Sequence, residues 1–253
     1  MDAHEIQPGS AELERACAWA EAHFEHALLF LADVRGPLAR HARFFSAERD
    51  AGTCGVAVRF EAFGTPTLAC ASRDAEACAA LIQAGRSPEC ILITHEHQPL
   101  PAAISVLPTS MDTWLTRACA PQAVPPGVSR VADASALAEL YAEQGAHYFH
   151  PDMLQLGHWY GARSEAGKLI SAGGLHFLIA DRYAQLGGLF TAEHARGRAW
   201  ATRILAAISS SLAEAGVPRC GLFADGSDPS LPAFYAARGF QVQGRFAFRT
   251  LAA

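Results

Sequence analysis

The sequence has 253 residues, of which 51% are hydrophobic and 18% charged, and its formal net charge is -5 at pH 7. This composition supplies ample material for a packed core and excludes a globally disordered chain. The acidic balance argues against a protein that coats nucleic acid or an anionic membrane, so we expect neither as a partner.

The seven cysteines are scattered, and none belongs to a Cys-x-x-Cys pair. That pattern predicts reduced, mostly buried thiols rather than a disulfide framework. The opening segment MDAHEIQPGSAELER is too polar for a signal peptide, and the apolar runs are too short to span a bilayer. We therefore expect a soluble cytoplasmic protein.

The first half of the chain, over residues 1–120, is expected to form an α/β domain. Apolar residues at helical spacing predict one helix over 11–30, and a second helix is expected within SRDAEACAALIQAG, which has an N-cap residue and a final glycine. Strands are expected at 54–63, 65–72 and 89–96. The segment APQAVPPGVSR at 120–130 contains three prolines and a glycine, so it is predicted to connect this domain to a second one over 128–253.

The second half alternates strand and helix patterns, which indicates an α/β or mixed α+β class. A helix at 133–145 is predicted to begin at Asp133 or Ser135 and to end at Gly145, and a longer helix after residue 201 should end at Gly216. A short helix is expected within 229–239. Strands are expected at 157–163, 168–180, 182–191, 219–224 and 240–251.

The order strand, helix, strand occurs in both halves, at 65–96 and at 182–224. Two interpretations are open: the halves share one fold, or two α/β units are similar by chance. Only the second copy has a basic turn between its strand and its helix.

That basic turn is RGRAWA at 196–201. A helix N-terminus presents unpaired N–H groups and the positive end of the helix dipole, and both favour a phosphate. Gly197, Ala199 and Ala201 are small enough for phosphate oxygens to approach the backbone. The alternative is an ordinary basic first turn of a surface helix.

The context of this turn resembles the GNAT superfamily of acyl-CoA-dependent N-acyltransferases. Its signature Gln/Arg-x-x-Gly/Ala-x-Gly/Ala is matched by Arg196, Ala199 and Ala201. A following Asn-x(6)-Tyr-x(3)-Gly-Phe pattern is matched at Tyr235, Gly239 and Phe240, with Asp228 in place of asparagine. The resemblance covers about residues 128–250. It implies a GNAT-like central mixed sheet flanked by helices, preceded by a second α/β domain that is a candidate degenerate copy in a tandem arrangement.

The resemblance also implies acetyl-CoA as co-substrate, without a metal. The residues expected to contact it are Leu189, Phe190, Thr191, Arg196, Gly197, Arg198, Ala199, Trp200, Ala201, Thr202 and Asp228. The backbone of 189–191 is expected to pair with the pantetheine arm of the cofactor, at a point where two strands separate, and to polarise the thioester carbonyl.

Two residues are candidates for proton transfer. The resemblance implies that Tyr235 protonates the departing thiolate, and the alternative is a core tyrosine on a helix. Some family members place a glutamate base where this sequence has Gln185, which cannot act as a base. His176 is the remaining candidate, with a packed core histidine or proton loss through water as alternatives.

The expected reaction is direct transfer of the acetyl group from acetyl-CoA to an amine on a small molecule or a peptide. A catalytically silent acyl-CoA-binding or regulatory module is the alternative, and a homodimer is left open. The aromatic and histidine-rich stretch AHYFHPDMLQLGHWYG is expected to line the acceptor pocket, with ordinary core packing as the other interpretation.

Overall fold

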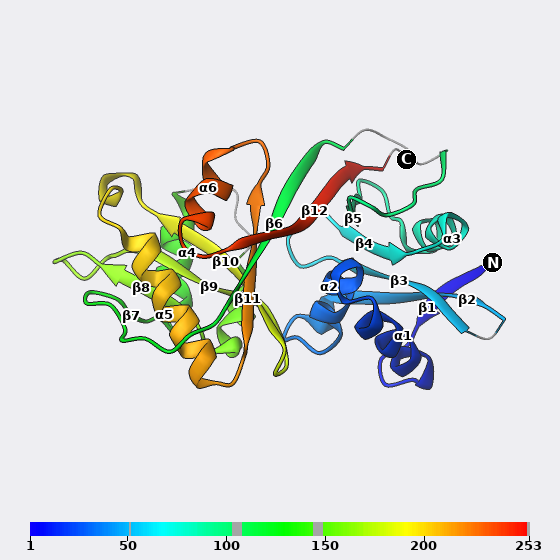
Figure 1. Cartoon of the computed structure of the whole chain (residues 1–253), viewed down its shortest axis with the longest axis horizontal. Helices are drawn as coiled ribbons and strands as arrows, with labels where there is room; N and C mark the ends of the chain where they lie inside the picture. The colour runs from blue at the N-terminus through cyan, green and yellow to red at the C-terminus, as the bar shows by residue number, and fades with distance from the viewer. Residues whose placement is uncertain (51, 103–107, 144–148, 252–253) are drawn as a thin grey trace. The chain divides into compact units, whose positions relative to one another are not determined.

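A computed structural model describes residues 1–50, 52–102, 108–143 and 149–251 (Figure 1). The chain divides into two compact units. The first comprises Met1–Trp114, Ala224–Leu231 and Gln243–Ala253, and the second comprises Leu115–Phe223 and Pro232–Val242. The proline-containing segment 120–130 lies wholly within the second unit.

The first unit is built on strands in the order β1-β2-β3-β4-β5-β12. Its elements are β1 (Asp2–Ile6), α1 (Ala11–Ala22), α2 (Phe24–Val34), η1 (Ala39–His41), β2 (Ala42–Arg49), β3 (Gly52–Phe60), β4 (Thr67–Ser72), α3 (Ala75–Gly85), β5 (Ile91–His95) and β6 (Ser110–Ala118). Strands β1 to β4 are antiparallel, β5 is parallel to β4, and β12 is antiparallel to β5. Figure 1 shows α3 on the opposite side of these strands from α1 and α2.

The single helix predicted over 11–30 is wrong, because the chain forms two helices separated at His23. The His23 backbone leaves the helical region, at φ -122 and ψ 39. Its ring Nδ1 also lies 2.8 Å from the carbonyl oxygen of Trp19, one turn earlier. A side chain that bonds the preceding carbonyls competes with continuation of the helix.

The second unit contains strands in the order β11-β10-β9-β8-β7. Its elements are β7 (Ser129–Arg130), α4 (Ala134–Ala142), η3 (Pro151–Leu156), β8 (Tyr160–Arg163), β9 (Leu169–Ile179), β10 (Tyr183–Thr191), η4 (Glu193–Ala195), α5 (Trp200–Glu214) and β11 (Arg219–Asp225), followed by α6 (Ser230–Ala236) and β12 (Gln241–Thr250). Strands β7 to β10 are antiparallel, and β11 is parallel to β10. Strands β6, β11 and β12 and helix α6 each contribute residues to both units.

Two adjacent glycines of β9 show that helices cover both faces of these strands. A Cβ at Gly173 would meet Leu189 of β10 and Ile204 of α5, whereas a Cβ at Gly174 would fall within the ring of Trp159. Because successive residues of a strand point to opposite faces, α5 and Trp159 lie on opposite sides of the sheet. Tyr141 of α4 packs near Trp159, with ring centroids 6.4 Å apart.

The two units repeat one order of elements, as the sequence echo suggested. In each unit an antiparallel run of strands leads through a helix to a parallel neighbour: β4, α3 and β5 in the first, and β10, α5 and β11 in the second. Each unit also takes a strand from the other half of the sequence. The end of β6 lies beside β11, where the Leu115 carbonyl is close to Gly221, and β12 pairs with β5.

The mixed α/β class predicted from the sequence is confirmed. The carboxylate of Asp133 caps α4, accepting from the N–H groups of Ser135 at 3.0 Å and Ala136 at 3.1 Å. The predicted helix end at Gly145 lies outside the described residues. Strands β1, β2, β6 and β7 were not predicted, and β7 lies in the segment that was expected to connect two domains. In the part of the chain that the structure describes, no helix is long and apolar enough to cross a bilayer.

Candidate functional site

Strand β10 separates from its parallel neighbour within the second unit. The register with β11 consists of Ala184 opposite Cys220 and Gln185 opposite Gly221, although β10 continues to Thr191. In the described residues, the stretch 186–191 has no partner on β11. Side chains donate hydrogen bonds to the carbonyls of Phe190 and Thr191, from Ser171 Oγ and Arg196 Nε. The pairing of 189–191 with an extended ligand stays a prediction.

A β-bulge directs this end of β10. The register with β9 shifts between Gly187 and Phe190, and the intervening Gly188 has φ 59, a conformation that glycine adopts without strain. The hydroxyl of Tyr141 donates a hydrogen bond to the carbonyl of Gly188. Tyr141 is fully buried, so the bulge is fixed from inside the core. Sequence analysis missed Tyr141, which gave no signal beyond an aromatic residue in an amphipathic helix.

The turn that follows leads into the N-terminus of α5. Arg196 Nε donates to the carbonyl of Thr191 at 3.2 Å, and Ala199 adopts the left-handed conformation with φ 58. Among the described residues, no side chain caps α5 at Ala199. The first helical hydrogen bond runs from the N–H of Arg203 to the carbonyl of Ala199, at 3.1 Å.

The N–H groups of Trp200, Ala201 and Thr202 therefore precede the first intrahelical bond of α5. Together with the positive end of the helix dipole, they form an arrangement suited to an anion. Gly197 has φ 77 and no neighbouring atom within 4 Å of a hypothetical Cβ, so the turn is also open.

The ring of Trp200 serves as an anchor for this turn. It packs against a small apolar cluster that contains Ala162, Ile170 and Ala195. The guanidinium of Arg203 lies 4.8 Å from its centroid. The indole is thus committed to packing, and its buried Nε1 has no hydrogen-bond partner among the described residues.

Tyr235 is 9% exposed and lies on the short helix α6. Its ring packs edge-on against Phe234 and Phe240, at centroid distances of 5.1 and 5.7 Å. Burial raises the pKa of the phenol to about 12, with an opposing contribution from the charge of Arg238. The phenol is therefore protonated at neutral pH and can donate a proton or a hydrogen bond.

His176 lies on β9 with its ring against Gly187 of β10. Its Nε2 atom is buried and has no hydrogen-bond partner among the described residues. Burial lowers the pKa of His176 to about 4, so the imidazole is neutral at pH 7 but is a weak base. Nearby on β10, the side-chain carbonyl of Gln185 accepts a hydrogen bond from the hydroxyl of Tyr183. The role of His176 as a base stays a prediction.

Asp228 belongs to the residues of the first unit. Its Oδ1 accepts from Ser230 N–H at 2.9 Å and from Ser230 Oγ at 2.6 Å, which caps the start of α6. The structure thus gives Asp228 a local structural role, and its expected contact with the cofactor stays a prediction.

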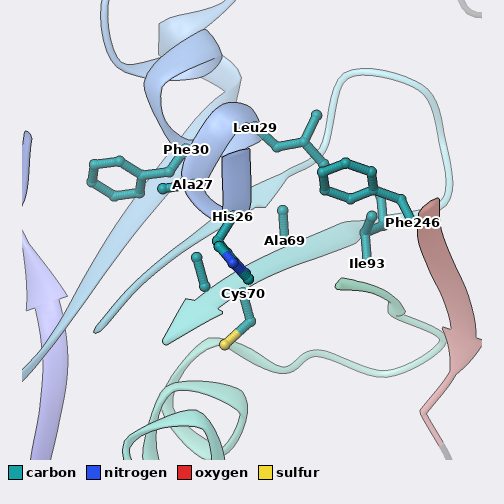
Figure 2. A pocket seen from close by; sticks show the side chains of 9 residues that line it. His26, Ala27, Leu29, Phe30, Ala69, Cys70, Ile93 and Phe246 are labelled. Atoms are coloured by element: carbon teal, nitrogen blue, oxygen red, sulfur yellow. The ribbon is translucent and has the colours of Figure 1, made fainter. Parts of the chain in front are cut away.

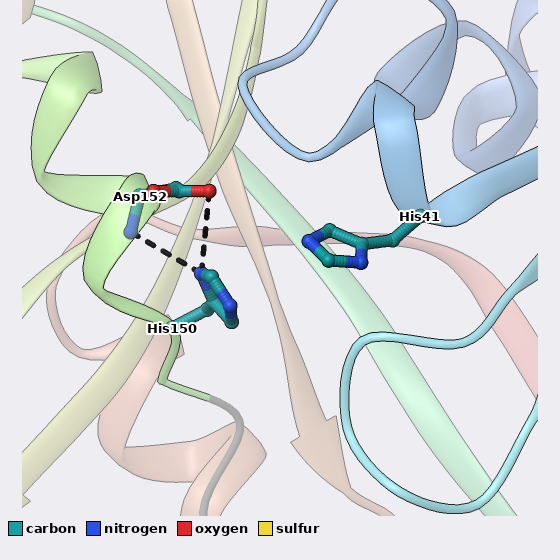
Figure 3. A group of neighbouring side chains, drawn as sticks. All are labelled: His41, His150 and Asp152. Carbon is teal, nitrogen blue, oxygen red and sulfur yellow. Dashed lines mark hydrogen bonds and ion pairs between the residues drawn. The ribbon is translucent and has the colours of Figure 1, made fainter.

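The aromatic and histidine-rich stretch is mainly a packing element where the structure describes it. Phe149 and Trp159 are buried and pack against each other, with ring centroids 5.2 Å apart. This contact agrees with core packing, the other interpretation of the stretch. His158 Nδ1 lies 2.9 Å from Ser211 Oγ. Figure 3 shows His150 turned toward Asp152, whose N–H donates to its Nδ1 at 3.2 Å. Residues 146–148 of this stretch lie outside the described residues.

The corresponding strand end in the first unit is closed by side chains. Gln98, 7% exposed, accepts from the N–H of Ser72 at 3.0 Å and donates to the carbonyl of Ser72 at 2.6 Å. Ser72 is the last residue of β4, so this amide takes the place of a pairing strand. Asp74 then caps α3, accepting from Glu76 N–H at 2.8 Å and Ala77 N–H at 3.3 Å.

The first unit also contains a small pocket beside β4 (Figure 2). Its walls are mainly apolar, with His26 and Cys70 as the polar contributors; the other lining residues are Ala27, Leu29, Phe30, Ala69, Ala71, Ile93 and Phe246. His26 also lies beside His95, with the two rings tilted and their centroids 4.6 Å apart. The pocket presents no charged side chain that would attract a phosphate.

Comparison with known proteins supports the fold assignment. No protein-family model matches the sequence, and no curated protein matches it. Among solved structures, the chain is similar to a putative GNAT-family acetyltransferase from Novosphingobium aromaticivorans, with 19% identity, a TM-score of 0.60, and coverage of 87% of this chain and 96% of that one.

Two further structures are similar over nearly the whole chain. A GCN5-related N-acetyltransferase from Sphaerobacter thermophilus has 16% identity and a TM-score of 0.62, covering 97% of this chain and 93% of its own. A tandem GNAT protein from the clavulanic acid biosynthesis pathway has 16% identity and a TM-score of 0.59, covering 98% and 97%. At these identities the similarity establishes the fold.

Proposed function

We propose that this chain, which has the GNAT acetyltransferase fold, transfers an acetyl group from acetyl-CoA directly to an amine, using its second unit. The observation that carries the proposal is the uncapped N-terminus of α5 beside the separated end of β10. The helix end suits the pyrophosphate and the free strand edge suits the amide-containing pantetheine arm. Arg196 and Arg198 add positive charge to the turn.

The reaction needs one proton donor for the thiolate that leaves. The amine nitrogen bonds to the thioester carbonyl carbon, and the carbon–sulfur bond breaks with its electron pair going to sulfur. Tyr235 gives its proton to that sulfur and regains one from solvent. The nitrogen loses its proton to ordered water or to His176, and backbone N–H groups of 189–191 stabilise the carbonyl oxygen.

The acceptor is an amine on a small molecule or a peptide, and we propose that the protein acts in the cytoplasm. No metal is needed for this transfer. The state of association, including a homodimer, does not enter the mechanism because every residue named for it belongs to one chain.

The experiment that tests the proposal is release of free thiol from acetyl-CoA in the presence of a panel of amines. Turnover above the rate without protein supports an acetyltransferase. Binding of acetyl-CoA without turnover on any amine would instead favour the silent acyl-CoA-binding module. Absence of both binding and turnover would overturn the proposal.

A further inference from the structure

Arg238 connects the first turn of α5 to helix α6 within the second unit. Its Nε donates to Thr202 Oγ1 at 2.8 Å, and its Nη1 donates to the carbonyl of Phe234 at 2.5 Å. The guanidinium also lies 3.4 Å from the centroid of the Phe234 ring. One planar side chain thereby fixes the separation between the α5 N-terminus and the helix that carries Tyr235.

A second arginine also connects Arg238 to α5. Arg117 Nη1 donates to the backbone carbonyl of Arg238 at 3.0 Å, and its Nη2 donates to the carbonyl of Leu205 at 3.3 Å. Its guanidinium lies 5.0 Å from the centroid of Phe240. Phe240 in turn contacts Tyr235, so the tyrosine is enclosed by residues that the two arginines hold.

Neither guanidinium has a carboxylate partner in the part of the chain that the structure describes. Arg117 donates from Nη1 and Nη2, and Arg238 from Nε and Nη1, to carbonyl and hydroxyl oxygens, none of which carries a full negative charge. Arg238 is the charged group that acts directly on Tyr235, and its charge favours the ionised form of the phenol against the effect of burial. A positive charge here also favours the thiolate that departs in the proposed reaction.

We propose that Arg238 is a positioning residue of the transfer reaction, which ties the helix that carries Tyr235 to the cofactor-binding end of α5. The positive charge of the same guanidinium also acts on the phenol. The inference rests on the proposed function of the second unit. It extends that function because Arg238 connects α6, which carries the proton donor Tyr235, to Thr202 on α5.

The first test measures the acidity of the residue at 235 without any acceptor. A difluorotyrosine placed at 235 is more acidic than tyrosine, which brings its titration into a range where the protein is folded, and 19F NMR follows it. Arg238→Met should raise its pKa by about one unit, because a nearby positive charge is lost. Arg238→Lys and the control Arg219→Met, an exposed arginine on β11, should leave it within a few tenths of a unit.

The second test separates positioning from binding. Thr202→Val keeps the charge of Arg238 and the backbone N–H at 202, the group placed in the anion site, but removes the Oγ1 that Arg238 bonds on α5. With an accepted amine, Arg238→Met and Thr202→Val should both lower kcat, by about tenfold or more for Arg238→Met, while the Kd of acetyl-CoA changes less than about threefold. Arg238→Lys should restore part of kcat.

An unchanged pKa at position 235 in Arg238→Met would overturn the electrostatic part of the inference. Full kcat in both Arg238→Met and Thr202→Val would overturn the positioning part. If the wild-type protein binds no acetyl-CoA, the proposed function fails, yet the 19F titration still reports whether Arg238 acts on residue 235. Circular dichroism checks that each variant is folded. If Arg238→Met does not fold, Arg238→Lys and Thr202→Val carry the test.

Discussion

The two units form the same junction between a strand and a helix, but they satisfy its backbone groups in opposite ways. In the first unit, the amide of Gln98 pairs with the end of β4, and the carboxylate of Asp74 caps α3. In the second unit, β10 ends without a β11 partner, and α5 begins at Ala199 without a side-chain cap. The first junction is satisfied from within the chain, whereas the second is the one that we propose for the ligand.

The difference shows that the fold alone does not create a binding site. A helix N-terminus attracts an anion only when its N–H groups are not already bonded and no carboxylate occupies the same place. Asp74, which also lies 2.8 Å from Arg49, puts a negative charge at the junction of the first unit. We therefore expect acetyl-CoA to bind only to the second unit.

The largest expected effect is on turnover. Tyr235→Phe should lower kcat by about 100-fold or more, because general acid catalysis contributes on that scale, with little change in the Kd of acetyl-CoA. Steady-state thiol release and calorimetric binding measure the two quantities. Tyr160→Phe, which also removes a hydroxyl from a buried tyrosine of this unit, is the control. Equal turnover in Tyr235→Phe and wild type would remove the tyrosine from the mechanism.

A substitution that gives the second junction the character of the first should abolish ligand binding. Ala199→Asp supplies a carboxylate cap to α5, at a left-handed position that Asp tolerates better than Ala. Acetyl-CoA affinity should fall by at least about 100-fold, because like charges in contact cost several kcal/mol. Ala199→Asn is the neutral matched control, because its amide oxygen also competes for the N–H groups of α5 but adds no charge, so its loss of affinity should be clearly smaller. Similar losses in both variants would point to shape rather than charge.

Acid should destabilise both units through histidines whose pKa is lowered in the folded state, and one in each unit has a large shift. Burial lowers the pKa of His95 and of His176 to about 4, from 6.5 in the unfolded chain. The unfolded state therefore binds more protons between these values, so stability is fully present above about pH 6.5 and falls as the pH drops toward 4. From pH 7 to pH 5 each histidine should remove about 2 kcal/mol.

Urea unfolding at the two pH values measures this loss. His95→Gln and His176→Gln should each reduce the pH dependence, whatever their effect on stability at pH 7. A pH dependence equal to that of the wild type in both variants would show that these histidines are not buried as neutral groups.

The smallest effect is expected in the first unit. Gln98→Ala leaves the N–H and carbonyl of Ser72 without their partner, so the free energy of unfolding should fall by about 1–3 kcal/mol. The Kd of acetyl-CoA should not change. Gln83→Ala, at an exposed position of α3, is the control. A change in acetyl-CoA affinity on loss of Gln98 would connect the first unit to binding and contradict the division of roles.

The sequence predicted the second unit better than the first for a physical reason. Local signals such as the Asp133 cap and the small residues at 197–201 are visible in sequence because they act on neighbouring residues. The part played by Gln98 depends on Ser72, which is distant in the sequence, and the contact between Arg238 and Thr202 is also long-range. Neither residue stands in a recognisable pattern.

Strand prediction failed where a strand is defined by its neighbours rather than by its own pattern. β1 has one buried residue, Ile6, and is a strand because it pairs with β2. β6 follows a stretch without helical or strand periodicity and ends beside β11, which belongs to the other half of the sequence. The break at His23 likewise depends on a hydrogen bond to Trp19 that hydrophobic spacing does not reveal.

A calorimetric titration of the wild-type chain with acetyl-CoA tests the difference between the units most directly. One site per chain, retained in Gln98→Ala and lost in Ala199→Asp, is the predicted result. Two sites per chain, or one site that survives in Ala199→Asp, would show that the junction of β10 and α5 is not the acetyl-CoA site.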